Sequence, residues 1–80
     1  MKDRTIEARF AAAAVARLVE NPAIGLVTIT MDRDQIRLGA STGAGGTSCV
    51  RGYDAIAKAD DATTAGFLAA GEVLARLGFV

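Results

Sequence analysis

The chain contains no histidine, no tryptophan, one proline and a single cysteine, Cys49, in 80 residues. Without imidazole, the Ser-His and Cys-His pairs used by most hydrolases cannot be assembled, and a zinc site has no nitrogen ligands. One cysteine also excludes an internal disulfide, which fits a reducing compartment. These absences predict a protein that is not an enzyme and that binds no metal or cofactor.

Excess charge and long apolar runs are also absent. Nine basic residues balance nine acidic ones, so the chain lacks the basic stripe with which proteins displace counterions from phosphates. The longest apolar run, residues 10–16, is far shorter than the roughly 20 residues that cross a bilayer. Acidic residues near the amino end argue against a targeting signal. We therefore expect a cytoplasmic protein that does not contact membranes, and the many alanines, glycines and arginines are typical of bacterial or phage coding sequences.

The length predicts one domain, residues 1–80, with a thin core. Hydrophobic residues make up 51% of the chain, but alanine alone supplies about a fifth of it. A domain of this size has a marginal stability unless it self-associates. The apolar end, Phe79 and Val80, follows Gly78 and is expected either to fold back on the core or to be buried against a second chain. A homodimer is thus one expectation.

Two segments have helical periodicity. The first begins at Thr5 and is closed by Asn21 and Pro22, which end a helix through a left-handed turn and a missing N–H. The second covers about residues 64–77 and ends at Gly78. We expect Asp60 and Asp61 to cap it, and its apolar stripe is predicted at these positions: Phe67, Leu68, Gly71, Leu74 and Leu77.

Glycines inside the second helix predict a close contact. Gly66 and Gly71 each cost about 1 kcal/mol relative to alanine within a helix. Their presence therefore indicates that another backbone approaches closely at both positions.

Between the helices, the apolar period changes to two. Val27, Ile29 and Met31 alternate with threonines, and Ile36 and Leu38 alternate with polar residues beyond a turn at residues 32–34, as in a hairpin with one buried face. The fold predicted is α+β: a small antiparallel sheet of two or three strands, with an amino-terminal and a carboxy-terminal helix packed on one face. The aspartates of the turn suit turn geometry rather than a metal site.

Residues 41–48 contain three glycines and no apolar period, which predicts a mobile loop. This loop is a candidate contact for a macromolecule through these residues: Thr42, Gly43, Gly45, Gly46 and Thr47. Residues 49–60 are ambiguous between a third strand and a helical turn, and we favour a strand for residues 49–53. Lys58 with Ser41 or Ser48 forms a catalytic Ser-Lys pair only if burial lowers the lysine pKa. Cys49 is expected to be a small buried hydrophobe rather than a nucleophile.

Three arginines form the best candidate binding patch. Arg33, Arg37 and Arg51 are expected on one polar face or edge of the sheet, with Tyr53 nearby as an aromatic anchor. Arginine is frequent at interfaces because its planar guanidinium is weakly hydrated. These features favour a non-catalytic protein-binding module, for example a small regulator, an adaptor, or a phage-encoded or mobile-element-encoded inhibitor of a bacterial system.

The alternative function is nucleic-acid binding. The predicted order of helix, sheet and helix is similar in topology to double-stranded RNA-binding domains, which implies that Arg33, Arg37 and Arg51 contact phosphates. Such a domain is expected to present lysines at the start of its last helix, where this chain has Asp60 and Asp61. The protein-binding interpretation therefore comes first.

Overall fold

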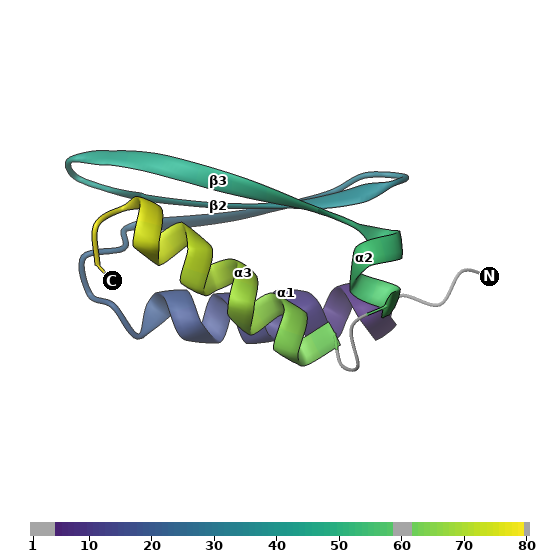
Figure 1. The fold of residues 1–80 in the computed structure, drawn as a ribbon. Coiled ribbons are helices and arrows are strands. Elements are labelled where there is room, and N and C mark those ends of the chain that lie inside the picture. Colours follow the sequence, from purple (N-terminus) through teal and green to yellow (C-terminus); the bar gives the residue numbers. More distant parts are fainter. Residues whose placement is uncertain (1–4, 59–61, 80) are drawn as a thin grey trace.

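A helix, an antiparallel sheet and two further helices follow one another along the chain in the computed structural model, which describes residues 5–58 and 62–79. The elements are α1 (Thr5–Val19), β1 (Leu26–Met31), β2 (Gln35–Thr42), β3 (Gly45–Gly52), α2 (Tyr53–Lys58) and α3 (Ala62–Arg76). The sheet has the order β1-β2-β3, and both long helices lie on one side of it (Figure 1). The predicted α+β fold, with its two helices on one face, is confirmed.

The first helix begins and ends where the sequence indicated. Its core face carries Phe10, Ala14 and Leu18, which recur at helical spacing and are fully buried. After the last turn, the Asn21 N–H donates to the carbonyl of Leu18, and the Asn21 Oδ1 accepts from the Ala23 N–H at 2.9 Å. These bonds reverse the chain and direct it into the sheet.

The register of the sheet brings its apolar side chains onto the helical side. Ile36, Leu38 and Ala40 of the central strand are buried, and Ile29 of β1 pairs with Leu38. Cys49 of β3 also pairs with Leu38 and is buried. Side chains alternate along a strand, so the intervening residues point away from the helices. The period-two pattern thus assigned the core face of β2 correctly.

The prediction of a mobile loop at residues 41–48 is wrong. β2 runs on to Thr42 and β3 already begins at Gly45, so the connection is a short turn around Gly43 and Ala44. The Thr42 Oγ1 accepts from the Ala44 N–H at 3.1 Å and donates to the Gly45 carbonyl at 3.3 Å. Gly45 has a φ of 152°, which favours glycine. Glycine allows the hairpin to close tightly, and the pairing with β2 supplies the order that local propensity lacks.

Residues 49–60 were ambiguous between a strand and a helical turn, and the structure contains both. β3 ends at Gly52, the Tyr53 N–H donates to the Asp34 carbonyl, and α2 starts there. The third strand is confirmed and is four residues longer at its start than expected, while Tyr53 belongs to the helix. The predicted caps Asp60 and Asp61 and the side chain of Lys58 lie outside the described residues.

The third helix turns a different face to the core than predicted. Its buried residues are Gly66, Ala69, Ala70, Val73 and Leu74. Phe67 is 50% exposed and Leu68 is 62% exposed, so the predicted stripe is wrong at these two large side chains. The end at Gly78 is confirmed: its φ is 92°, its N–H donates to the Ala75 carbonyl, and the Phe79 N–H donates to the Leu74 carbonyl, as in a Schellman motif.

The two long helices are in contact at the glycines of α3. A Cβ at Gly66 would collide with the backbone carbonyl of Phe10, which confirms a close backbone approach there. At Gly71 the neighbour is instead a side chain, since a Cβ would lie 2.6 Å from the Arg17 Nη1. Arg17 donates to the Phe67 carbonyl at 2.6 Å, and its guanidinium lies 3.9 Å from the centre of the Phe67 ring. The expectation of a close backbone at Gly71 is therefore wrong.

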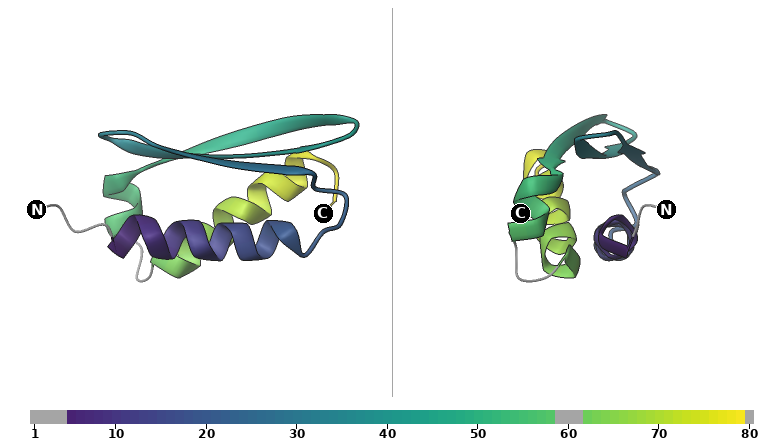
Figure 2. Two further views of the ribbon diagram at one scale, coloured as in Figure 1. Left: turned by 180° about the vertical axis from the view of Figure 1, so that it is seen from behind. Right: turned by 90° about the vertical axis from the view of Figure 1, so that its right-hand side faces the viewer.

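The helices cover the sheet on one side only. α1 runs beneath β1 and α3 runs beneath β3, and the opposite face of the sheet has no described element over it (Figure 2). Within the described ranges, the helices are too short or too polar to cross a membrane.

Candidate functional site

The uncovered face of the sheet, called the outer face below, has mostly short side chains. Its members alternate with the buried residues of β2 and follow from the register of β1 and β3. They are Leu26, Thr28 and Thr30 on β1; Gln35, Arg37, Gly39 and Ser41 on β2; and Gly46, Ser48, Val50 and Gly52 on β3. The surface is therefore rich in hydroxyl groups, and no described element covers it.

A shallow groove of about 330 Å³ lies in this outer face. Gly39 of the central strand and Gly46 of β3 carry no side chain, which leaves this space open. A Cβ at Gly39 would lie 2.7 Å from the Thr28 Oγ1, so the absence of a side chain there lets Thr28 bend across the central strand. The groove is lined by Leu26, Thr28, Gly39, Ala40, Ser41, Gly46, Thr47 and Ser48.

Arg37 is the one charged residue among the outward strand positions. It pairs with Thr30 on one side and with Val50 on the other, and it is exposed. Within residues 5–58 and 62–79, its side chain makes no hydrogen bond or ion pair. An unpaired guanidinium on a neutral surface attracts a carboxylate from another molecule.

The structure does not assemble the predicted patch of three arginines. Arg51 pairs with Ile36, a core residue, and therefore lies on the helical side of the sheet, opposite to Arg37. Arg33 is in the turn between β1 and β2, where its N–H donates to the Asp32 Oδ1 at 2.7 Å. Tyr53 packs against the core cluster. Of the four predicted anchors, the outer face keeps Arg37 alone, because strand alternation sends Arg51 to the other side.

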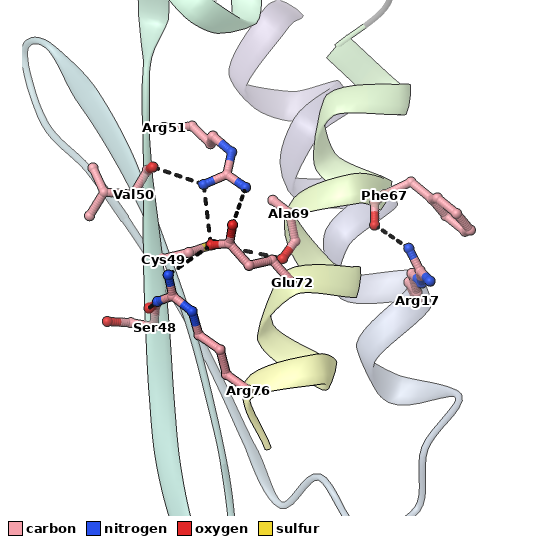
Figure 3. A network of polar contacts seen from close by, with 9 residues as sticks. All are labelled: Arg17, Ser48, Cys49, Val50, Arg51, Phe67, Ala69, Glu72 and Arg76. Atoms are coloured by element: carbon pink, nitrogen blue, oxygen red, sulfur yellow. Dashed lines mark hydrogen bonds and ion pairs between the residues drawn. The ribbon is translucent and has the colours of Figure 1, made fainter. Parts of the chain in front are cut away.

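Arg51 belongs to an ion-pair network that links β3 to α3 (Figure 3). Its Nη2 lies 3.1 Å from the Glu72 Oε1, and the Arg76 Nη2 lies 3.4 Å from the Glu72 Oε2. The hydrogen bond from Arg51 lowers the pKa of Glu72 below its usual value of 4.5. Glu72 and Arg76 were not among the predicted residues, although their spacing of four in a helix could have indicated an ion pair.

The same arginines occupy the free edge of β3. The Arg76 Nη1 donates to the Ser48 carbonyl at 2.8 Å, and the Arg51 Nη1 donates to the Val50 carbonyl at 3.0 Å (Figure 3). Carbonyls at a sheet edge otherwise accept hydrogen bonds from an additional strand. Two outward carbonyls of β3 thus already have donors, which disfavours the addition of a strand at this edge.

Cys49 lies beneath this network and is 4% exposed. Its Sγ is 3.7 Å from the Ala69 carbonyl, to which the thiol donates. Burial raises the pKa of Cys49 above 9.0, and the Arg51 charge opposes this effect only in part. The expectation that Cys49 is buried is confirmed, and a buried thiol with a raised pKa is a poor nucleophile.

The remaining candidates lie at one end of the sheet or at the end of the chain. Thr42 belongs to β2, and Gly45, Gly46 and Thr47 belong to β3, so Gly43 alone of the predicted loop contacts lies in the turn. Phe79 is 43% exposed beyond α3, and Val80 lies outside the described residues.

Comparison with protein-family models, curated proteins and solved structures finds no match to this chain.

Proposed function

We propose that this protein is a non-catalytic protein-binding module that recognises its partner through the outer face of the sheet. Arg37 carries the proposal, because it is an exposed guanidinium without a partner among the described residues, on a face whose other outward strand residues are uncharged. A carboxylate of the partner would form a bidentate, charge-assisted pair with it. The surrounding threonines, serines and glycines allow another backbone to approach closely.

The nucleic-acid alternative draws less support from the arrangement of charges. Phosphate binding uses several cations that act together on one surface. Here Arg51 is paired with Glu72 and Arg17 lies over Phe67, so neither guanidinium is available without the loss of an existing contact. A partner with one or a few carboxylates matches the outer face better than a polyanion does.

The test compares three forms of the full chain as baits in a lysate of the source cell. Wild type, Arg37→Glu and the control Arg9→Glu are tagged and used in parallel, with and without nuclease. Arg9 is an exposed arginine of α1, in the helical layer, so its reversal makes the same change of net charge away from the outer face. Because both arginines are exposed, circular dichroism should show an unchanged fold in both variants.

We expect one protein that wild type and Arg9→Glu retain, that Arg37→Glu loses, and that survives nuclease. The purified partner should then bind at least about tenfold more weakly to Arg37→Glu, since a charge-assisted pair contributes about 1.5–3 kcal/mol. Equal retention by all three baits would contradict the proposal. Loss of all material on nuclease treatment, with steep salt dependence, would favour the nucleic-acid alternative.

A further inference from the structure

The two edge strands of the sheet differ in whether their outward backbone groups already have hydrogen-bond partners. β3 has guanidinium groups on its outward carbonyls, at Ser48 and Val50. β1 pairs with β2 alone among the described strands, so its other side lacks a strand partner. An edge of this kind is a template for a further strand unless charge, proline or a covering element blocks it.

The backbone groups that point outward from β1 follow from the hydrogen-bond pattern. The Asp32 N–H donates to the Gln35 carbonyl, so the even-numbered residues of β1 bond to β2. In an antiparallel pair these alternate with residues whose N–H and C=O groups point away. Val27 and Ile29 therefore offer their backbone groups to the open edge.

The sequence of β1 has none of the usual protections of an edge. It reads Leu-Val-Thr-Ile-Thr-Met, with no charge and no proline over residues 26–31. Its β-branched residues favour an extended conformation. Lysine or proline at an edge strand is the ordinary means of preventing strand addition, and neither is found here.

The helix below this edge presents an apolar surface. Phe10 and Arg17 face α3, and Ala14 and Leu18 face the core. Successive residues of a helix are rotated by about 100° around its axis. By this rotation, Ala11 and Val15 lie beside Ala14 and Leu18 on the side of α1 away from α3, and both are half-buried. An added strand would rest its inward side chains on Ala11 and Val15, which carry no charge. Glu7 lies one turn before Ala11 in the same row, but it is 4% exposed and therefore does not reach this surface.

We infer that the β1 edge takes up an extended, uncharged segment of a partner protein as an additional strand. This inference rests on the proposed function, because it names how the partner would attach. A second copy of this chain fits less well, because α1 runs beneath β1 (Figure 2). Paired edge strands lie about 4.8 Å apart, whereas two packed helices need about 8–10 Å.

The experiment uses a labelled peptide, Thr-Val-Thr-Ile-Thr-Val-Thr with blocked ends, as the probe for the full chain. Fluorescence anisotropy measures its binding, and amide hydrogen exchange measures protection of the protein. Two methylated peptides serve as a matched pair: one has N-methyl groups on the valines and the isoleucine, the other on internal threonines. In an extended peptide these two sets point to opposite edges.

We expect the parent peptide to bind saturably. The affinity of one methylated peptide should be at least about tenfold lower, and that of the other should stay within about twofold of the parent. The amides of Val27 and Ile29 should gain protection when the peptide binds, and those of Ser48 and Val50 should not. Val27→Pro should weaken binding, whereas Val50→Pro, the same change at the opposite edge, should not. Should Val27→Pro fail to fold, the methylated pair still decides the matter.

Absence of saturable binding, or equal binding of the parent and both methylated peptides, would overturn the inference. So would protection confined to β3, or a chain that sediments as a dimer with its β1 amides protected before peptide is added. The peptide has no carboxylate, so Arg37→Glu should bind it as wild type does. Failure of the peptide would therefore leave the Arg37-dependent partner, and with it the proposed function, intact.

Discussion

Replacement of Gly66 by alanine should destabilise the protein, although alanine is the better helix former. The change gains about 1 kcal/mol in helix propensity. However, the added Cβ would collide with the Phe10 carbonyl oxygen and lie 2.9 Å from the carbonyl carbon. These are backbone atoms of α1, so they cannot move unless the helix moves, and the helices must separate by about 1 Å to restore ordinary carbon contacts.

Overpacking a tight contact costs about 1–3 kcal/mol, and the upper end applies here because the atoms that the Cβ meets are backbone. After the gain of about 1 kcal/mol in propensity, the expected net effect is a loss of about 2 kcal/mol. For a domain of this size, that loss lowers Tm by roughly 8–16 °C. Gly71→Ala is the matched control in the same helix. The atoms nearest to its Cβ would be those of the flexible Arg17 guanidinium. The stacking of this guanidinium on Phe67 is worth about 0.5–1 kcal/mol, and its loss would offset the propensity gain.

Thermal and urea unfolding, followed by circular dichroism, measure both variants. Gly66→Ala should unfold well below wild type, and Gly71→Ala should stay within about 1 kcal/mol of it. A Gly66→Ala protein as stable as wild type would show that the helices do not approach each other at Phe10. Equal losses in both variants would show that the backbone contact and the side-chain contact are equivalent, which also refutes the reasoning.

Two further predictions concern the Glu72 network and the thiol below it. The hydrogen bond from Arg51 lowers the pKa of Glu72 in the folded state below its usual value of 4.5. The ion pairs therefore contribute their full stability at pH values above 4.5, and this stability is lost as the pH falls through the lower pKa of the folded state. The urea midpoint of wild type should therefore fall more between pH 6 and pH 3 than that of Glu72→Gln, and parallel curves would contradict this. Because burial raises the pKa of Cys49, iodoacetamide at pH 8 should alkylate the native protein at least roughly a hundredfold more slowly than the protein in urea. Similar rates in the two conditions would show that the thiol is accessible.

Periodicity predicted most of the fold, because the strongest signals come from large apolar residues at regular spacing. Phe10 and Leu18 marked the core face of α1, and Ile36 and Leu38 marked that of β2. The signal failed at residues 41–48, where glycine suggested a loop. Pairing with a neighbouring strand overrides the weak propensity of glycine, and sequence spacing does not show that pairing.

In α3, side-chain size misled the assignment of the core face. Ala69 and Ala70 are buried while Phe67 and Leu68 are exposed, because a close helix contact admits only small residues. Gly66 marked this contact, and the predicted stripe would have matched the structure if it had been centred on that glycine. Small residues at helical spacing were the better indicator here.

The expected position on the polar face of the sheet holds for Arg37, and alternation could have corrected the position of Arg51. Cys49 was expected to be buried, and Arg51 lies two residues further along the same strand, so both belong to the same face. Arg51 is therefore directed toward α3 and is unavailable on the outer face. The contrast between the two edges was beyond prediction, since the arginine caps on β3 depend on the packing of α3 against it.

The contact at Gly66 connects the stability of the fold to its open surfaces. Two helices about 8–10 Å apart match the width of three strands spaced about 4.8 Å apart, so α1 and α3 fit beneath the sheet with each under an edge strand. If Gly66→Ala pushes α1 away from α3, the helix moves toward the open side of β1, where an added strand would need space. The variant should therefore lose affinity for the strand peptide at temperatures where it is still folded, while Gly71→Ala keeps that affinity. If the Gly66→Ala protein is folded and destabilised but binds the peptide with wild-type affinity, the spacing of the helices does not control the space for an added strand beside β1.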